Sequence, residues 1–138
     1  MPTVSASRLR NIASDLLKCA GASREEADIV SVHVVGANLA GHDSHGILQI
    51  PRYVDRVKKG EIVPGANFEI VSETDNSTVV DGNWGFGYVV TEKAMQITIE
   101  KARRNSVAAA TVFRQGHVGR VSDYPVMAAK AGMIGMMT

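Results

Sequence analysis

Two short segments hold most of the side chains in this sequence that could carry out acid–base chemistry. The first is residues 41–53, GHDSHGILQIPRY, which places two histidines, an aspartate and a serine next to one another. The second is residues 116–120, GHVGR, where His117 lies between two glycines and precedes Arg120. An imidazole titrates near neutral pH and can deliver a proton to a developing alkoxide, so His45 is a candidate general acid or base. A histidine that caps the following helix remains an equal alternative.

Two other kinds of chemistry fit the first segment poorly. A zinc site could draw on His42, Asp43 and His45, with His117 as a distant fourth ligand, but structural zinc favours four ligands with cysteine prominent. We therefore predict no metal. A serine hydrolase needs a nucleophile within reach of its base, and the adjacent Ser44 and His45 would point apart on a regular helix or strand. The sequence also lacks a G-x-S-x-G motif.

The second segment lies where α/β folds bind ligands, because it follows an apolar run at 107–113 and precedes a predicted helix. Its glycines allow a ligand to approach the backbone, and Arg120 can hold a carboxylate or a phosphate. A solvated loop is the alternative interpretation. Another glycine cluster, Gly82 to Gly87, fails as a dinucleotide fingerprint because Val90 occupies the third glycine position, and it is better interpreted as a tight turn from strand to helix.

The first sixty residues predict three helices. Ser5 or Ser7 can cap the first helix, whose apolar stripe is Leu9, Ile12, Ala13, Leu16 and Leu17. Ser23 and Glu26 form a capping box for the second helix, with Ala27, Val30, Val34 and Ala37 inward and His33 as a packed imidazole. The third helix ends at Lys58–Lys59. It begins either near His45, or later with Pro51 in its first turn and HDSHG as a loop.

The pattern changes after Pro64. Short strands are predicted at 68–71 and 78–80, followed by a helix at 88–104, a strand buried on both faces at 107–113, a helix at 121–130 and an apolar strand at 132–138. Because the chain stops inside that strand, we expect a longer polypeptide. The fold class is thus α/β (α+β): a helical subdomain at 1–62 and an incomplete α/β domain at 63–138.

Composition excludes several classes of protein. The 138 residues carry 15 Lys and Arg against 14 Asp and Glu, so there is no basic excess of the kind that nucleic-acid or membrane-surface binding favours. The single cysteine, Cys19, fits a reducing compartment, and no apolar run reaches the length of a transmembrane helix. We expect a cytoplasmic globular protein.

Four stretches of the chain, in order and spacing, resemble the type 2 malate/L-lactate dehydrogenase family: AGHDSHGILQIPRYVDRVKKGEI (40–62), VVDGNWGFGYVVTEKAM (79–95), GHVGR (116–120) and AGMIGMMT (131–138). The resemblance implies a homodimeric oxidoreductase that uses NAD or NADP to act on a small 2-hydroxy or 2-oxo acid, with a nucleotide-binding domain that is not a Rossmann fold. It also implies that this chain is the N-terminal portion, inactive alone.

The resemblance assigns roles to individual residues. His45 would be the proton donor or acceptor and Ser44 its orienting partner. His117 would lie beside the nicotinamide, as a cofactor contact and a competing candidate for the acid–base role. Tyr53 would border the substrate, and the remaining cofactor contacts would be Val118, Gly119, Arg120 and Val121.

Gln49 departs from the family pattern, since many relatives carry an arginine there that binds the substrate carboxylate. Glutamine lacks both the charge and the fork geometry of arginine, so this recognition is weakened or moves to Arg52 or Arg120. A non-catalytic, self-associating α/β module is the rival hypothesis, and a nucleic-acid binder is a distant third.

Overall fold

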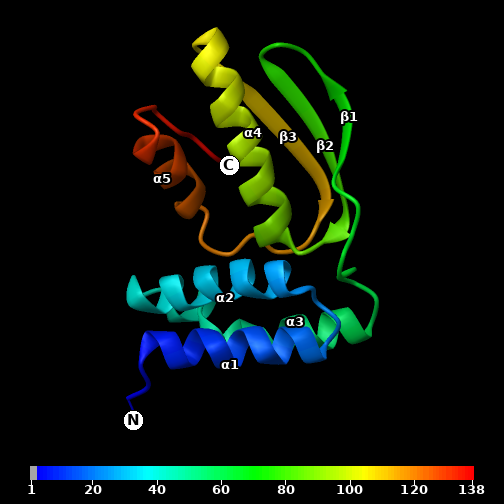
Figure 1. Cartoon of the computed structure of the whole chain (residues 1–138), viewed down its shortest axis with the longest axis vertical. Helices are drawn as coiled ribbons and strands as arrows, with labels where there is room; N and C mark the ends of the chain where they lie inside the picture. The colour runs from blue at the N-terminus through cyan, green and yellow to red at the C-terminus, as the bar shows by residue number, and fades with distance from the viewer. Residues whose placement is uncertain (1–2) are drawn as a thin grey trace.

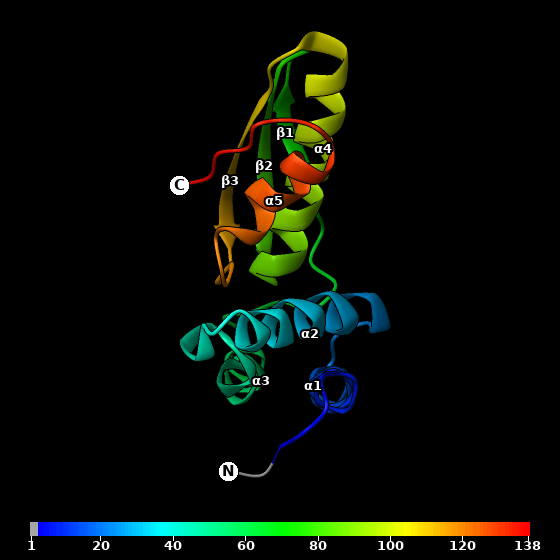
Figure 2. The same ribbon diagram turned by 90° about the vertical axis from the view of Figure 1, so that its left-hand side faces the viewer.

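The computed structural model describes residues 3–138, which form two layers (Figures 1 and 2). The helical layer contains α1, α2 and α3, and the sheet layer contains a three-stranded sheet with α4 and α5. This confirms the α/β fold class. The helices are α1 Ala6–Cys19, α2 Arg24–Leu39, α3 Ile50–Lys58, α4 Gly87–Asn105 and α5 Asp123–Lys130, and the strands are β1 Glu69–Glu73, β2 Ser77–Gly85 and β3 Ala109–Gln115.

The starts of the first two helices follow their predicted caps. The Ser5 side chain accepts from the Arg8 backbone N–H at the start of α1. The capping box of α2 is complete, because Ser23 Oγ accepts from the Glu26 N–H and the Glu26 carboxylate accepts from the Ser23 N–H. These bonds satisfy amide donors that have no partner inside the helix.

The start of α3 resolves the two alternatives in favour of the later one. Pro51 lies in the first turn of α3, where its missing N–H costs no helical hydrogen bond. Residues 43–49 precede it as two 3₁₀ turns, Asp43–His45 and Ile47–Gln49.

The helical layer is held together by apolar side chains from all three helices. The predicted inward residues of α2 are buried, and Ala13 and Leu17 of α1 pack with them. Ile12 and Leu16, predicted to lie on the same stripe of α1, are instead 43% and 47% exposed. Only part of that stripe faces α2 and α3, so these two side chains lie beyond its buried edge.

The sheet has the order β1-β2-β3, with β1 antiparallel to β2 and β2 parallel to β3. α4 connects the two parallel strands and packs on one face of the sheet, and α5 packs against α4 (Figure 1). Because β2 and β3 are parallel, their carboxyl ends meet at the same end of the sheet, next to α2 (Figure 1). The residues that follow each strand therefore lie beside the helical layer.

Two predictions about the last third of the chain were wrong. The segment 107–113 is not buried on both faces: β3 is an edge strand that α4 covers on one side, and Val107 and Phe113 are 72% and 42% exposed. Residues 132–138 begin with a turn and a bend and do not form a strand, because no strand within residues 3–138 pairs with them. β2, by contrast, continues through the glycine-rich segment to Gly85, well beyond the predicted 78–80.

His33 joins the two layers. It lies on α2 with a side chain only 10% exposed, so its prediction as a packed imidazole was right about burial. Each ring nitrogen also contacts a carboxylate of the sheet layer: Nδ1 is 3.1 Å from Asp123 and Nε2 is 3.0 Å from Glu92. No helix in the described part of the chain is long and apolar enough to cross a membrane.

Candidate active site

The structure brings the two predicted segments together. The rings of His45 and His117 stack with centroids 5.6 Å apart and planes inclined by 29°. His45 ends the first 3₁₀ turn before α3, and His117 lies in the loop that follows β3. Two imidazoles from segments more than seventy residues apart thus meet where the two layers adjoin.

The turn that carries His45 is held by Asn38, a residue that the sequence analysis missed. The Asn38 side chain accepts from the Ile47 backbone N–H at 2.8 Å and donates to the Asp43 carboxylate at 2.6 Å. It also packs so closely on Gly46 that a Cβ at that position would overlap it. Asn38 could have been identified as a polar residue near the end of a helix, just before an irregular segment. Such segments need hydrogen-bond partners for their backbone groups.

Ser44 contacts its neighbour, contrary to the expectation that the two side chains diverge. Ser44 Oγ lies 2.9 Å from Nδ1 of His45. The expectation assumed a regular helix or strand, whereas Ser44 and His45 lie in a short 3₁₀ turn. The contact fixes one nitrogen of the His45 ring and leaves Nε2 for other partners.

His117 contacts a buried pair of tyrosines. The Tyr53 hydroxyl lies 2.9 Å from Nδ1 of His117 and 2.9 Å from the Tyr88 hydroxyl. Loss of water around the ring, and then the neighbouring His45 and Arg56, lower the pKa of His117 below its ordinary value. Burial raises the pKa of both Tyr53 and Tyr88, so both hydroxyls keep their protons at neutral pH.

The loop after His117 is fitted closely against α4 and α5. Gly119 has a φ of +71°, and a Cβ there would overlap the Tyr88 ring. The Tyr124 hydroxyl donates to the Val118 carbonyl at 2.7 Å, and Arg120 pairs with Asp123. Nε of Arg120 is buried without a hydrogen-bond partner within residues 3–138. Val121 closes the loop and is 40% exposed.

The three predicted substrate residues occupy different positions. Gln49 donates its side-chain amide to the Ser44 carbonyl, so it braces the turn that carries His45. Arg52 is exposed and forms no ion pair with any residue of the described chain. Tyr53 is only 2% exposed, and its hydroxyl is used by Tyr88 and His117.

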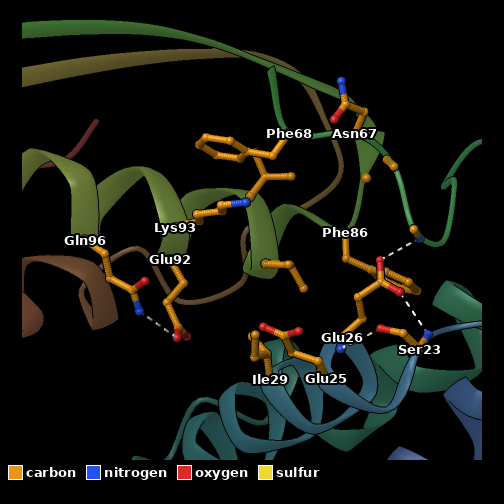
Figure 3. A pocket seen from close by; sticks show the side chains of 15 residues that line it. Ser23, Glu25, Glu26, Ile29, Asn67, Phe68, Phe86, Glu92, Lys93 and Gln96 are labelled. Atoms are coloured by element: carbon orange, nitrogen blue, oxygen red, sulfur yellow. Dashed lines mark hydrogen bonds between the residues drawn. The ribbon is translucent and has the colours of Figure 1, made fainter. Parts of the chain in front are cut away.

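A cavity of about 510 Å³ lies elsewhere, between the start of α2 and α4 (Figure 3). Lys93 lies 4.5 Å from the centre of the Phe68 ring on one side of it, and Glu25 and Glu26 face it from α2. None of the candidate site residues lines this cavity. Among residues 3–138 no three His, Cys, Asp or Glu side chains are placed to share a metal ion.

Comparison with known proteins gives one matching family model and several similar dehydrogenases. The family model described as malate/L-lactate dehydrogenase matches residues 4–138. Hydroxycarboxylate dehydrogenase B of Escherichia coli O157:H7 is 38% identical over 114 residues, which are 83% of this chain and 32% of that protein. Malate/(S)-sulfolactate dehydrogenase of Methanothermus fervidus is 38% identical over 127 residues, which are 92% of this chain and 38% of that protein.

A solved structure gives the same result. Malate dehydrogenase from Pyrococcus horikoshii superimposes with a TM-score of 0.93 at 30% identity, covering 95% of this chain and 38% of that one. The chain thus spans about a third of the length of these relatives.

Proposed function

Because this chain belongs to the malate/L-lactate dehydrogenase family, we propose that it forms the N-terminal part of an NAD- or NADP-dependent oxidoreductase acting on a small 2-hydroxy or 2-oxo acid. The stacked pair of His45 and His117 carries this proposal. Oxidation of a hydroxy acid releases a proton from its hydroxyl group, and reduction of an oxo acid consumes one. Imidazoles exchange protons at neutral pH, and these two lie in reach of one small ligand.

In this proposal His45 exchanges the proton with the substrate oxygen. Ser44 holds Nδ1 of His45, so Nε2 is the atom that gives or takes the proton. His117 lies beside the nicotinamide, and it is the competing candidate for the same acid–base step. Each ring is hydrogen-bonded through Nδ1, that of His45 to Ser44 and that of His117 to Tyr53.

The loop 116–121 is the proposed cofactor contact, and its residues fit such a group. Arg120 keeps a buried Nε that lacks a hydrogen-bond partner in the described chain, and a charged donor of this kind suits a phosphate or carboxamide oxygen. The closely packed backbone around Gly119 keeps the loop in one shape. When bound, the nicotinamide supplies or accepts the hydride.

Arg52 is the favoured carboxylate ligand of the substrate. Gln49 is engaged with the Ser44 carbonyl, and Arg120 is paired with Asp123, so both are partly committed. Arg52 follows Gln49 by three residues, directly precedes Tyr53 on α3, and has no carboxylate partner among the described residues. A guanidinium binds a carboxylate through two parallel hydrogen bonds.

The test is titration of this chain with NADH and with NADPH, followed by cofactor fluorescence. We expect binding that weakens about tenfold or more in His117→Ala, corresponding to loss of one good contact. His45→Ala should bind the cofactor nearly as well, because its proposed partner is the substrate oxygen. His42→Ala, an exposed histidine of the same segment, is the matched control.

The rival self-associating module makes the opposite prediction. It gives no cofactor binding, or binding that neither substitution changes, together with a concentration-dependent dimer in analytical ultracentrifugation. We propose a cytoplasmic homodimer under either hypothesis, so dimerisation alone does not separate them. Assays with pyruvate, oxaloacetate and glyoxylate should show negligible turnover by these 138 residues, because positioning both reactants supplies much of the rate in such enzymes.

A further inference from the structure

Two buried tyrosine hydroxyls lie in a row behind His117. Tyr53 on α3 and Tyr88 in the first turn of α4 are each 2% exposed, and their hydroxyl oxygens are 2.9 Å apart. Tyr53 then reaches Nδ1 of His117, also at 2.9 Å. The row therefore begins on α4 of the sheet layer, passes through Tyr53 of the helical layer, and ends on the ring of His117 in the candidate active site.

The number of hydrogens available to these two hydrogen bonds decides which group donates in each. If Tyr53 donates to Nδ1 of His117, then Tyr88 donates to Tyr53 and both hydroxyl hydrogens have an acceptor. In the reverse direction Nδ1–H donates to Tyr53 and Tyr53 donates to Tyr88, which leaves the Tyr88 hydrogen without an acceptor among residues 3–138. A buried hydroxyl without its partner is costly, so the forward direction is favoured.

We infer that the Tyr88–Tyr53 hydroxyl pair is a positioning device that holds His117 as a neutral imidazole with its hydrogen on Nε2. The hydrogen bond at one ring nitrogen decides which tautomer is present. With Nδ1 accepting from Tyr53, Nε2–H is the group left for a ligand. The inference rests on the proposed function for its consequence: His117 would donate a hydrogen bond to a substrate or cofactor oxygen, while His45 moves the proton.

The surroundings of His117 support a neutral ring. The groups that face it are His45 from the 3₁₀ turn, Arg56 and Tyr53 from α3, and Tyr88 from α4. None of them is an anion that would stabilise the imidazolium form. Tyr88 is itself fixed, because its ring packs against Gly119 and lies 5.3 Å from the His33 ring.

Nitrogen-15 NMR of histidine tautomers tests the inference without substrate or cofactor. Long-range proton–nitrogen correlations at a pH above the titration of His117 distinguish Nε2–H from Nδ1–H, and His117→Asn assigns the signals. In the unmodified chain we expect at least about a tenfold excess of the Nε2–H form, the ratio that one buried hydrogen bond supports. Nδ1–H as the major form would overturn the inference, whether or not any variant folds.

Three variants separate positioning from packing. Tyr53→Phe should lower the ratio to that of an imidazole whose Nδ1 has no donor, and Tyr88→Phe should lower it less, because Tyr88 strengthens Tyr53 as a donor. Tyr124→Phe is the matched control: this buried tyrosine donates to Val118 in the same loop without touching His117, so its removal should leave the ratio unchanged. An unchanged ratio in a folded Tyr53→Phe, verified by circular dichroism, also overturns the inference.

The tautomer measurement and the cofactor titration fail independently. A chain that binds no cofactor but shows the Nε2–H form would contradict the proposed function and leave the positioning device intact. A chain that binds the cofactor through His117 in the Nδ1–H form would support the proposed function and contradict the positioning role of the two tyrosines.

Discussion

Gly119 determines how closely the loop carrying His117 can approach α4. Its φ of +71° is disfavoured for residues with a side chain, and a Cβ would overlap the Tyr88 ring. Gly119→Ala therefore combines backbone strain with overpacking, and we expect it to lower the free energy of unfolding by about 2–4 kcal/mol. Urea denaturation monitored by circular dichroism measures the change.

Gly60→Ala is the matched control for this prediction. Gly60 has a similar φ of +72°, but no atom lies within 4 Å of the position that a Cβ would occupy. Gly60→Ala should lower the free energy of unfolding only through backbone strain, by about 1 kcal/mol. Equal losses at the two positions would show that the contact between the loop and Tyr88 does not form.

At the scale of the helices and strands, Glu26 completes the capping box of α2 and also links α2 to the segment that leads to β1. One carboxylate oxygen accepts from the Ser23 N–H at 2.9 Å, and the other accepts from the Gly65 N–H at 2.8 Å, in the segment leading to β1. We expect Glu26→Ala to cost about 2–3 kcal/mol, because two backbone donors lose their acceptor. Ser23→Ala should cost about 1 kcal/mol.

Glu25→Ala provides the comparison, since Glu25 is an exposed acidic residue in the same first turn of α2. It should change the free energy of unfolding by less than about 0.5 kcal/mol. If Ser23→Ala and Glu26→Ala cost the same, the bond to Gly65 adds nothing, and the link between α2 and the sheet layer is not part of the stability of α2.

A second pair of elements, β2 and β3, is joined by Asp81 and Arg114. The hydrogen bond from Arg114 holds the pKa of Asp81 below its ordinary value. A carboxyl group whose pKa is lower in the folded state contributes stability above its unfolded pKa, and this is lost as the pH falls through the folded value. We expect the melting temperature to fall below about pH 4, and to fall less in Asp81→Asn.

The control here is Asp75→Asn, in the exposed turn between β1 and β2. Its melting temperature at neutral pH should lie within about 2–3 °C of that of the unmodified chain, which corresponds to about 0.5 kcal/mol. The decrease of its melting temperature at low pH should be the same as in the unmodified chain. If the melting temperature of Asp81→Asn falls as steeply at low pH as that of the unmodified chain, the prediction is wrong. Differential scanning calorimetry between pH 7 and pH 2.5 provides both measurements.

The elements that sequence predicted well are those with local causes. Capping boxes, proline and apolar periodicity act within a few residues, so α1, α2 and α3 begin near their predicted positions. The errors lie where the outcome depends on a distant partner. An apolar run becomes a buried strand only if something covers both faces, and β3 has one face uncovered within residues 3–138.

The candidate site divides in the same way. Residue types and spacing singled out His45 and His117, because each motif is local, whereas the resemblance supplied Ser44 as the partner of His45. The roles of Asn38 and Tyr88 depend on contacts with residues far along the chain or on an irregular turn, which no periodicity encodes. Tyr53 was identified as a site residue by resemblance, but its hydroxyl contacts follow only from the packing of α3 against the start of α4.

At the scale of the whole molecule, the candidate site exists only where the two layers meet. His45 belongs to the helical layer and His117 to the sheet layer, so their stacking depends on how the layers are joined. At this joint α2 packs against α4, His33 also contacts Asp123 at the start of α5, and the rings of Tyr88 and Tyr124 lie 5.3 and 5.6 Å from the His33 ring. Stability of this joint and geometry of the site should therefore change together.

Replacing His33 tests this joint. His33→Leu introduces an apolar side chain of similar size and removes both contacts to Glu92 and Asp123. Each carboxylate retains one other partner, Gln96 and Arg120 respectively, so we expect a loss of about 2–3 kcal/mol rather than unfolding. Hydrogen exchange should accelerate in α2 and α5 together, because the residue connects them.

Val32→Ala is the neighbouring control, since Val32 is on the same helix and 51% exposed, and it should change stability by less than about 0.5 kcal/mol. The histidine tautomer measurement then extends the test to the site. If His33 holds the layers in place, His33→Leu should also weaken the Nε2–H preference of His117, because Tyr88 loses a packing neighbour. A destabilised variant with faster exchange in α2 alone would mean that His33 stabilises its own helix and not the joint.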